Sequence, residues 1–174
     1  MNINAVIPSK SYDFYLKNAY SSNRTARKAP ARLSLGKNDL VMADSAALKK
    51  VSEKLRMMEY SSDTGEEIYT NIKLFIDTYN NLMDSSDSST SSEISRARKL
   101  MENLTTKEKE ELEEIGITVS SDNKLKLKKE TLLECTPDKI RKVFSQDNSF
   151  TQSIKFYAGK INRSSRYINI SSSG

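Results

Sequence analysis

Acidic side chains form the densest cluster of groups in this sequence that could take part in acid–base chemistry. The cluster consists of Glu108, Glu110, Glu111, Glu113 and Glu114, within a stretch whose composition predicts one short helix. General acid–base catalysis needs positioned groups whose pKa values are tuned to the reaction, whereas a run of like charges on one helix is typical of a solvated face. We therefore interpret this cluster as an acidic surface and expect no catalytic carboxylate pair.

The absence of His and the scarcity of Cys exclude most other catalytic chemistry. The sequence contains no His and a single Cys, Cys135. A zinc site of His and Cys, a His-activated nucleophile and an intramolecular disulfide therefore cannot form. The sequence also lacks a glycine-rich phosphate loop and the Asp spacing of a Ca²⁺ loop. We expect no enzymatic activity, no metal and no cofactor, and we interpret Cys135 as a small packing residue.

Positive charge is concentrated at the two ends of the chain. Residues 1–35 hold six Lys or Arg against one Asp, and residues 136–174 hold seven against two, so the middle is acidic although the net charge is +5. The ends either fold back on the acidic middle or face an anionic partner. Because the acidic middle would repel phosphate, nucleic acid is the less favoured partner. The candidate contacts to an anionic partner are Arg24, Arg27, Lys28 and Arg32.

The predicted C-terminal helix also carries cations beside aromatic residues. This pattern fits a solvated helix face, and a nucleic-acid contact is the alternative. The residues concerned are Lys155, Lys160, Arg163 and Arg166, with Tyr157 and Tyr167.

Apolar residues recur in alternating steps of three and four, which predicts helices at residues 38–60, 66–83 and 149–168. The short turn between the first two favours an antiparallel hairpin. Because the spacing is that of coiled-coil a and d positions, we expect the stripes to pack on one another. The alternative is a seam left open for a partner helix or for self-assembly. The predicted core or interface residues are Val41, Leu48, Val51, Leu55, Ile68, Ile72, Phe75, Tyr79, Leu82, Phe150, Ile154, Tyr157 and Ile161.

A change of periodicity between positions 116 and 144 predicts a small mixed unit. Gly116 ends a helix, and alternation at residues 117–119 and 125–127 predicts a short β-hairpin. Pro137 then begins a helix that buries Val143 and Phe144.

We therefore expect a mainly α fold, an antiparallel coiled-coil helical bundle with a small β-hairpin. Residues 1–37 are expected to form a flexible basic segment, residues 38–168 a helical domain, and residues 169–174 a disordered tail. Within the domain we expect a helical hairpin at 38–83, a Ser-rich linker at 84–92, a helix plus β-hairpin subdomain at 93–148 and a C-terminal helix at 149–168.

Two stretches share residue types and order with one known family. The segment Phe75-Ile76-Asp77-Thr78-Tyr79-Asn80-Asn81-Leu82 is similar to a helix of the pattern Phe-Val-x-x-Tyr-Asn-x-Leu. The runs Ile115-Gly116-Ile117, Asn123-Lys124-Leu125-Lys126-Leu127 and Pro137 to Phe144 match a helix end, a hairpin and a second helix. Together they resemble the stalk region of the hook-associated proteins that cap the bacterial flagellar filament. The motif residues are Gly116, Leu125, Leu127, Pro137, Val143 and Phe144.

The resemblance implies a non-enzymatic structural protein that assembles through helix-mediated contacts, with copies of itself or with other axial flagellar proteins. At 174 residues the chain has no room for the large β-rich domains of that family. Export through the flagellar channel would make the protein extracellular, and without export it would be cytoplasmic. The alternative is a cytoplasmic chaperone-like or regulatory binder of a flagellar or secreted protein. We expect no classical signal peptide and no membrane span, because no apolar stretch is long enough.

Overall fold

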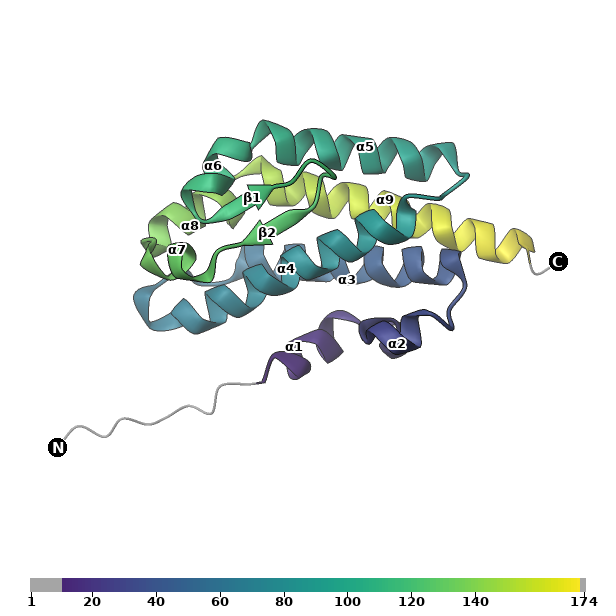
Figure 1. Ribbon diagram of the computed structural model, residues 1–174, viewed down its shortest axis with the longest axis horizontal. Helices are drawn as coiled ribbons and strands as arrows, with labels where there is room; N and C mark the ends of the chain where they lie inside the picture. The colour runs from purple at the N-terminus through teal and green to yellow at the C-terminus, as the bar shows by residue number, and fades with distance from the viewer. Residues whose placement is uncertain (1–10, 173–174) are drawn as a thin grey trace.

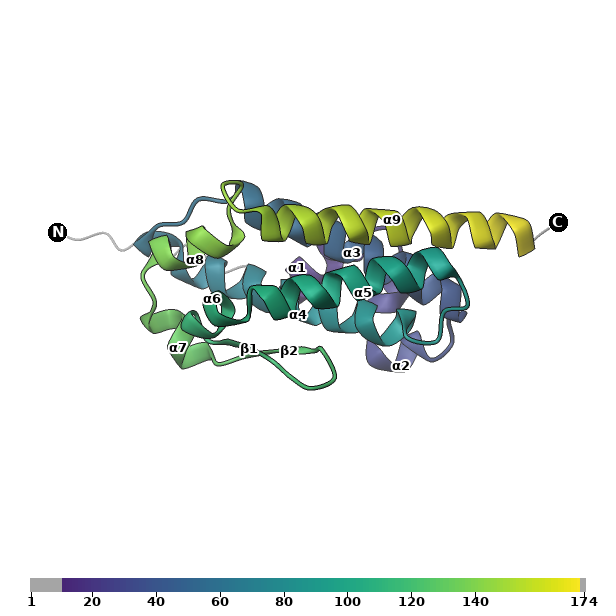
Figure 2. The same ribbon diagram turned by 90° about the horizontal axis from the view of Figure 1, so that it is seen from above.

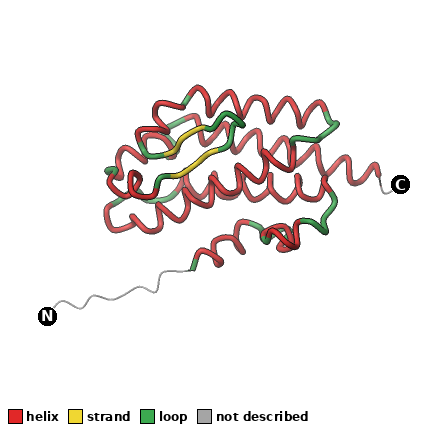
Figure 3. Tube along the Cα trace, in the orientation of Figure 1, coloured by secondary structure: helices red, strands yellow, loops and turns green. Residues whose placement is uncertain are grey.

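The computed structural model describes residues 11–172 and shows a mainly helical fold with a small two-stranded antiparallel sheet (Figures 1 and 3). The expectations for residues 1–10 and 173–174 lie outside the described residues. The helices are α1 (Tyr12–Ala19), α2 (Ala29–Arg32), α3 (Lys37–Met57), α4 (Gly65–Ser86), α5 (Ser92–Lys107), α6 (Lys109–Glu114), α7 (Lys129–Glu134), α8 (Pro137–Phe144) and α9 (Ser149–Ser172). Short 3₁₀ turns lie at Arg24–Arg27 and Ser62–Thr64, and the strands are β1 (Ile117–Val119) and β2 (Leu125–Leu127).

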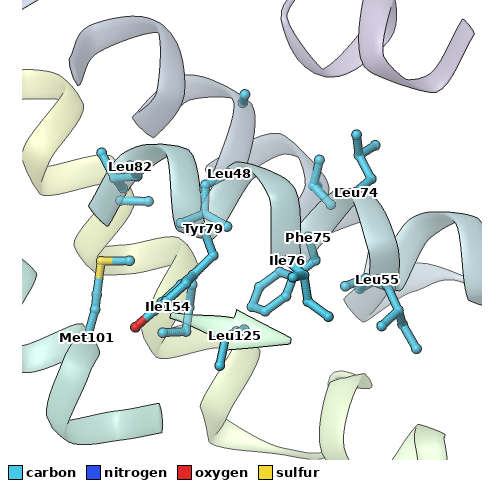
Figure 4. Packing of buried hydrophobic residues seen from close by; sticks show 14 of the residues in the cluster. Leu48, Leu55, Leu74, Phe75, Ile76, Tyr79, Leu82, Met101, Leu125 and Ile154 are labelled. Atoms are coloured by element: carbon cyan, nitrogen blue, oxygen red, sulfur yellow. The ribbon is translucent and has the colours of Figure 1, made fainter. Parts of the chain in front are cut away.

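The long helices α3, α4, α5 and α9 lie side by side and enclose the core (Figures 1 and 2). α3 packs between α4 and α9, and α5 packs along α9. All but one of the predicted core or interface residues are buried inside this bundle, while Tyr157 is half-buried at its surface. Their stripes face one another within a single chain, as Figure 4 shows for Leu48, Tyr79 and Ile154. The seams of α3, α4 and α9 are therefore closed internally.

Three phenylalanines join α4 and α9 of the bundle to α8, the helix that comes after the hairpin and α7. The Phe75 ring lies 5.4 Å from that of Phe144 and 6.2 Å from that of Phe150, measured between centroids, and both contacts are edge-on. Edge-to-face aromatic pairs add to the stability gained from apolar burial. α4, α8 and α9 thus share one aromatic cluster.

The hairpin has the predicted strands and packs against α4. Ile117 pairs with Leu127, and Val119 pairs with Leu125. Gly116 has a φ of 83°, and a Cβ there would lie 2.9 Å from the Thr131 side chain, so only glycine fits this turn.

The N-terminal segment differs from the expectation of a flexible basic region. Within the described residues, positions 11–36 form α1, a 3₁₀ turn and α2, and Tyr20 and Ala26 are buried. The expectation of flexibility came from the basic composition, whereas Tyr20 and Ala26 belong to the core. Tyr12, Tyr15 and Leu16 pack against the core alongside them.

Two further boundaries need correction. The connection between α4 and α5 is shorter than the Ser-rich linker predicted at residues 84–92, because α4 continues to Ser86 and α5 begins at Ser92, which leaves residues 87–91 between the helices. The buried Ser86 hydroxyl donates to the Leu82 carbonyl, and the Ser91 hydroxyl caps α5 by accepting from the Ile94 amide. The predicted disordered tail is helical as far as Ser172, because the Asn169 amide donates to Asp39 of α3 at 3.0 Å.

Candidate protein-binding face

α9 carries two apolar stripes, and only one of them is buried. The inner stripe includes Phe150, Ile154 and Ile161, which contribute to the core. A second stripe, the outer stripe, faces solvent in steps of four, three, four and three residues along the same helix. The outer stripe consists of Phe156, Lys160, Arg163, Tyr167 and Ile170.

The apolar members of the outer stripe are large side chains that are exposed to solvent. Phe156 is 50% exposed, Tyr167 71% and Ile170 72%. The last turns of α9 extend past the neighbouring helices at that end of the bundle (Figure 2). Large exposed apolar side chains gathered on one surface are typical of a site for another protein, whereas scattered ones need no explanation.

The charge on α9 is of one sign, because its sequence contains no Asp or Glu. Lys155 is used inside the fold, where it pairs with Glu53 of α3 at 2.6 Å. The Lys160 ammonium lies 5.0 Å from the centre of the Phe156 ring, in a cation–π contact. Arg163 and Arg166 form no ion pair with any residue in the described part of the chain. The outer surface of α9 therefore offers positive charge that the fold does not neutralise.

A groove between α5 and α9 runs beside the outer stripe and has a volume of about 270 Å³. Ala97 and Ser164 are small residues on its lining, and the Ser164 hydroxyl donates to Glu93 at 2.6 Å, which ties the two helices together. Arg96 and the 37% exposed Leu100 of α5 also line it. Across from them lie Tyr157, Lys160, Arg163 and Tyr167 of α9. We call this groove together with the outer stripe the α5–α9 face.

A larger hollow of about 510 Å³ lies between α1, α3 and α4, but its charged groups are already paired. Lys54 forms an ion pair with Glu67 at 2.7 Å. The Lys50 ammonium donates to the Asn18 carbonyl at 2.8 Å and to the Ser21 hydroxyl at 3.1 Å. Among the described residues, the cations of the α5–α9 face have no such ion-pair partner, so that face is the better candidate for recognition.

The predicted N-terminal contacts to an anionic partner do not form one surface. Arg32 donates two hydrogen bonds, each of 2.7 Å, to the fully buried carboxylate of Asp44, so its expected external partner is replaced by an internal one. Arg27 pairs with Asp13 at 3.1 Å, while Arg24 and Lys28 are exposed. A basic residue in the sequence could not be assigned to a partner without knowing which carboxylate lies buried beside it.

The family-like motif residues set the local fold rather than a surface. Leu125, Val143 and Phe144 are buried, and Pro137 is the first residue of α8. Leu127 is partly buried against the core, and Gly116 makes the turn into β1. Asn80 is part of the first motif, but its role did not follow from the sequence: its amide joins the two motifs by accepting from the Leu125 N–H and donating to its carbonyl, both at 2.9 Å.

Sequence reasoning named the cations of α9 but missed its outer stripe. The spacing of the inner stripe is by itself sufficient to predict the helix, and the second period lies among exposed residues. The signal that could have found them is the pair Phe156 and Tyr167, which lie on one helical face with two cations between them.

The predicted acidic cluster lies mostly at the surface, and Cys135 is partly buried. Glu110, Glu111, Glu113 and Glu114 are exposed on α6, and no group of His, Cys, Asp and Glu within residues 11–172 is placed to hold a metal ion. Burial raises the pKa of Cys135, whose thiol donates to the Glu114 carbonyl at 3.4 Å. A raised pKa keeps the thiol protonated and therefore weakly nucleophilic.

Among residues 11–172, no helix has both the length and the apolar character needed to cross a bilayer. No protein-family model, curated protein or solved structure matches this chain.

Proposed function

We propose that this chain is a non-enzymatic protein-binding domain that engages another protein through the α5–α9 face. The observation that supports this most strongly is the outer stripe, in which exposed Phe156, Tyr167 and Ile170 accompany Lys160 and Arg163. Aromatic and Arg side chains are the residues that most often dominate the energy of protein interfaces.

The closed seams decide where such a contact can form. Leu48, Phe75 and Ile154 are 0% exposed, so a partner helix cannot reach the inner stripes without opening the bundle. Removing these side chains from the core would cost several kcal/mol. The contact is therefore made on the outside of α5 and α9.

The resemblance to flagellar filament cap proteins suggests the setting for this proposal. In that setting the chain is a structural component of an axial assembly, with the hairpin and α8 as the unit that resembles the cap stalk. The proposal would then make the α5–α9 face the surface that contacts a neighbouring axial protein.

A chaperone-like or regulatory binder is the second candidate, and one observation favours it. The stripes of α3, α4 and α9 are satisfied within one chain, so the domain can remain a monomer and hold a single partner. A complex of one chain with one export substrate supports this candidate, whereas a complex of many subunits supports the structural component.

Site-specific photocrosslinking tests the proposed function directly. A photoreactive phenylalanine derivative replaces Tyr167 on the outer stripe, and in a matched control it replaces Leu133, an exposed residue of α7. In the cells that make the protein, irradiation is expected to give a discrete protein adduct at position 167 and none at position 133.

The same experiment can contradict the proposal. An absence of adducts at 167, or the same adducts at both positions, would show that the α5–α9 face is not a specific binding surface. Light scattering on the purified adduct then gives the number of chains and separates the two candidate functions.

A further inference from the structure

We propose that the partner held by the α5–α9 face is an amphipathic α-helix that carries acidic residues beside its apolar stripe. This inference rests on the proposed function, since it names the chemistry of the partner that the face would bind.

The spacing of the outer stripe matches the repeat by which two helices pack. Phe156, Arg163 and Ile170 are seven residues apart, and Lys160 and Tyr167 interleave with them. A stripe repeating every 3.5 residues stays in contact with a neighbouring helix over several turns. An extended peptide has a side-chain period of two and would meet this stripe only at isolated points.

The groove gives a partner helix a place to insert side chains. Ala97 and Ser164 are small, so α5 and α9 leave a hollow of about 270 Å³ between the bulkier Leu100 and Tyr157. Apolar side chains from a helix lying along α9 would fill this hollow, which is how helix-in-groove recognition works. The groove lies beside the outer stripe, so one helix can contact both.

The positive charge of the α5–α9 face favours a partner helix with acidic residues beside its apolar stripe. Arg96, Lys160 and Arg163 line the groove, and Arg166 lies one residue before Tyr167. Glu93 is the acidic residue at the groove, and its carboxylate already accepts a hydrogen bond from Ser164. Complementary charge speeds association and rejects basic partners, and this effect weakens as salt increases.

Exposed aliphatic residues favour a protein partner over a nucleic acid. Leu100 and Ile170 are 37% and 72% exposed, and neither offers a hydrogen bond or a stacking surface to a base or phosphate. Their burial against apolar side chains of a helix would be favourable.

The test uses the full chain and two designed peptides that differ only in charge. Each fluorescent peptide has three heptads with Leu at positions a and d, and carries either Glu or Lys at positions e and g. We expect the Glu peptide to bind at least about tenfold more tightly than the Lys peptide, with binding that weakens at high salt.

Three variants assign the binding to the face. Lys160→Glu with Arg163→Glu is expected to lose at least about tenfold in affinity for the Glu peptide. Tyr167→Ser with Ile170→Ser should also weaken binding although every cation remains. The matched control, Lys126→Glu with Lys128→Glu, makes the same charge change at exposed positions on and beside β2 and should bind as the wild type does. Circular dichroism checks that each variant remains folded.

Several outcomes would overturn the inference. Failure of the Glu peptide to bind, equal binding of both peptides, or unchanged binding by Lys160→Glu with Arg163→Glu would each do so. Tighter binding of an oligonucleotide, lost in the same variant, would instead make nucleic acid the ligand. A crosslink at position 167 without peptide binding would overturn this inference and leave the proposed function intact. Peptide binding without any cellular crosslink would contradict the proposed function, while the preference of the groove for an acidic helix would still stand.

Discussion

Asn80 shows how much of this fold depends on one side chain. Its amide donates to the Leu125 carbonyl and accepts from the Leu125 N–H, both at 2.9 Å, as a backbone strand would. β2 therefore has a hydrogen-bonding partner on each side, β1 on one and α4 on the other. This pairing fixes the hairpin on the bundle.

Replacing Asn80 with Ala should reduce the free energy of unfolding by about 1–3 kcal/mol, because it leaves two backbone groups of Leu125 without partners. Urea denaturation followed by circular dichroism measures the change. Asn103→Ala, at an exposed position of α5, is the control and should be nearly neutral. Equal stability of the two variants would show that the Asn80 bonds do not hold the hairpin.

Local and distant residue contacts differ in how well sequence reasoning predicts them. Gly116 was predicted to end a helix, because the need for a positive φ is a property of the local chain. The pairing of Asn80 with Leu125 spans 45 positions, and the pairing of Arg32 with Asp44 requires knowing which face of α3 is buried. Neither follows from local spacing.

At the scale of elements, a buried polar network docks the N-terminal segment onto the bundle. The Tyr20 hydroxyl donates to Asp44 at 2.9 Å and accepts from the Asn81 amide at 2.8 Å. Burial and the charge of Asp44 raise the pKa of Tyr20, so the hydroxyl stays protonated and able to donate. Arg32 completes the network with two hydrogen bonds to the same carboxylate.

Arg32→Ala should destabilise the protein by about 3–5 kcal/mol, because it leaves the Asp44 carboxylate buried without its cation. Removing Asp44 as well should restore part of that loss, which a double-mutant cycle in urea would measure. Additive losses in the two single variants would mean that the pair does not dock this segment.

The ion pair between α3 and α9 makes a small contribution that depends on pH. The hydrogen bond from Lys155 lowers the pKa of Glu53, so the pair stabilises the fold above the unfolded pKa of about 4.3 and is lost as pH falls through the lower folded value.

Because Glu53 is partly exposed, Glu53→Gln should cost only about 0.2–1 kcal/mol at neutral pH. Urea denaturation at neutral pH and well below the unfolded pKa should show that difference and then its disappearance. Glu59→Gln, at an exposed position before α4, is the matched control and should show no such change. A difference that persists unchanged in acid would contradict the role of the pair.

Element types followed from periodicity, whereas element ends did not. Helices α3, α4 and α9 lie where apolar spacing predicted them, because burying one face of a helix requires that spacing. The Ser-rich stretch and the C-terminal tail looked irregular by composition. The Ser86 hydroxyl instead bonds to a carbonyl within α4, and the Ser91 hydroxyl caps the start of α5. The Asn169 amide bonds to Asp39 of α3 in the extended end of α9.

At the scale of the whole molecule, the bundle encloses its inner stripes and leaves one cationic, aromatic surface outside. The inner stripes explain stability, since they bury Leu48, Phe75 and Ile154 completely. The α5–α9 face contributes little to that core, yet it gathers exposed Phe156 and Tyr167 with cations that form no ion pair within residues 11–172. In our proposal, stability and recognition lie on opposite sides of the same helix, α9.

The most direct test of this separation is the mass of the purified chain by light scattering after size exclusion, over a wide range of concentration and salt. We expect the mass of a monomer, 19.7 kDa, under all these conditions, because the inner stripes are closed and two like-charged α5–α9 faces repel each other. An oligomer whose mass is unchanged by Lys160→Glu with Arg163→Glu would contradict it, since assembly would then proceed through helix seams that the structure shows buried.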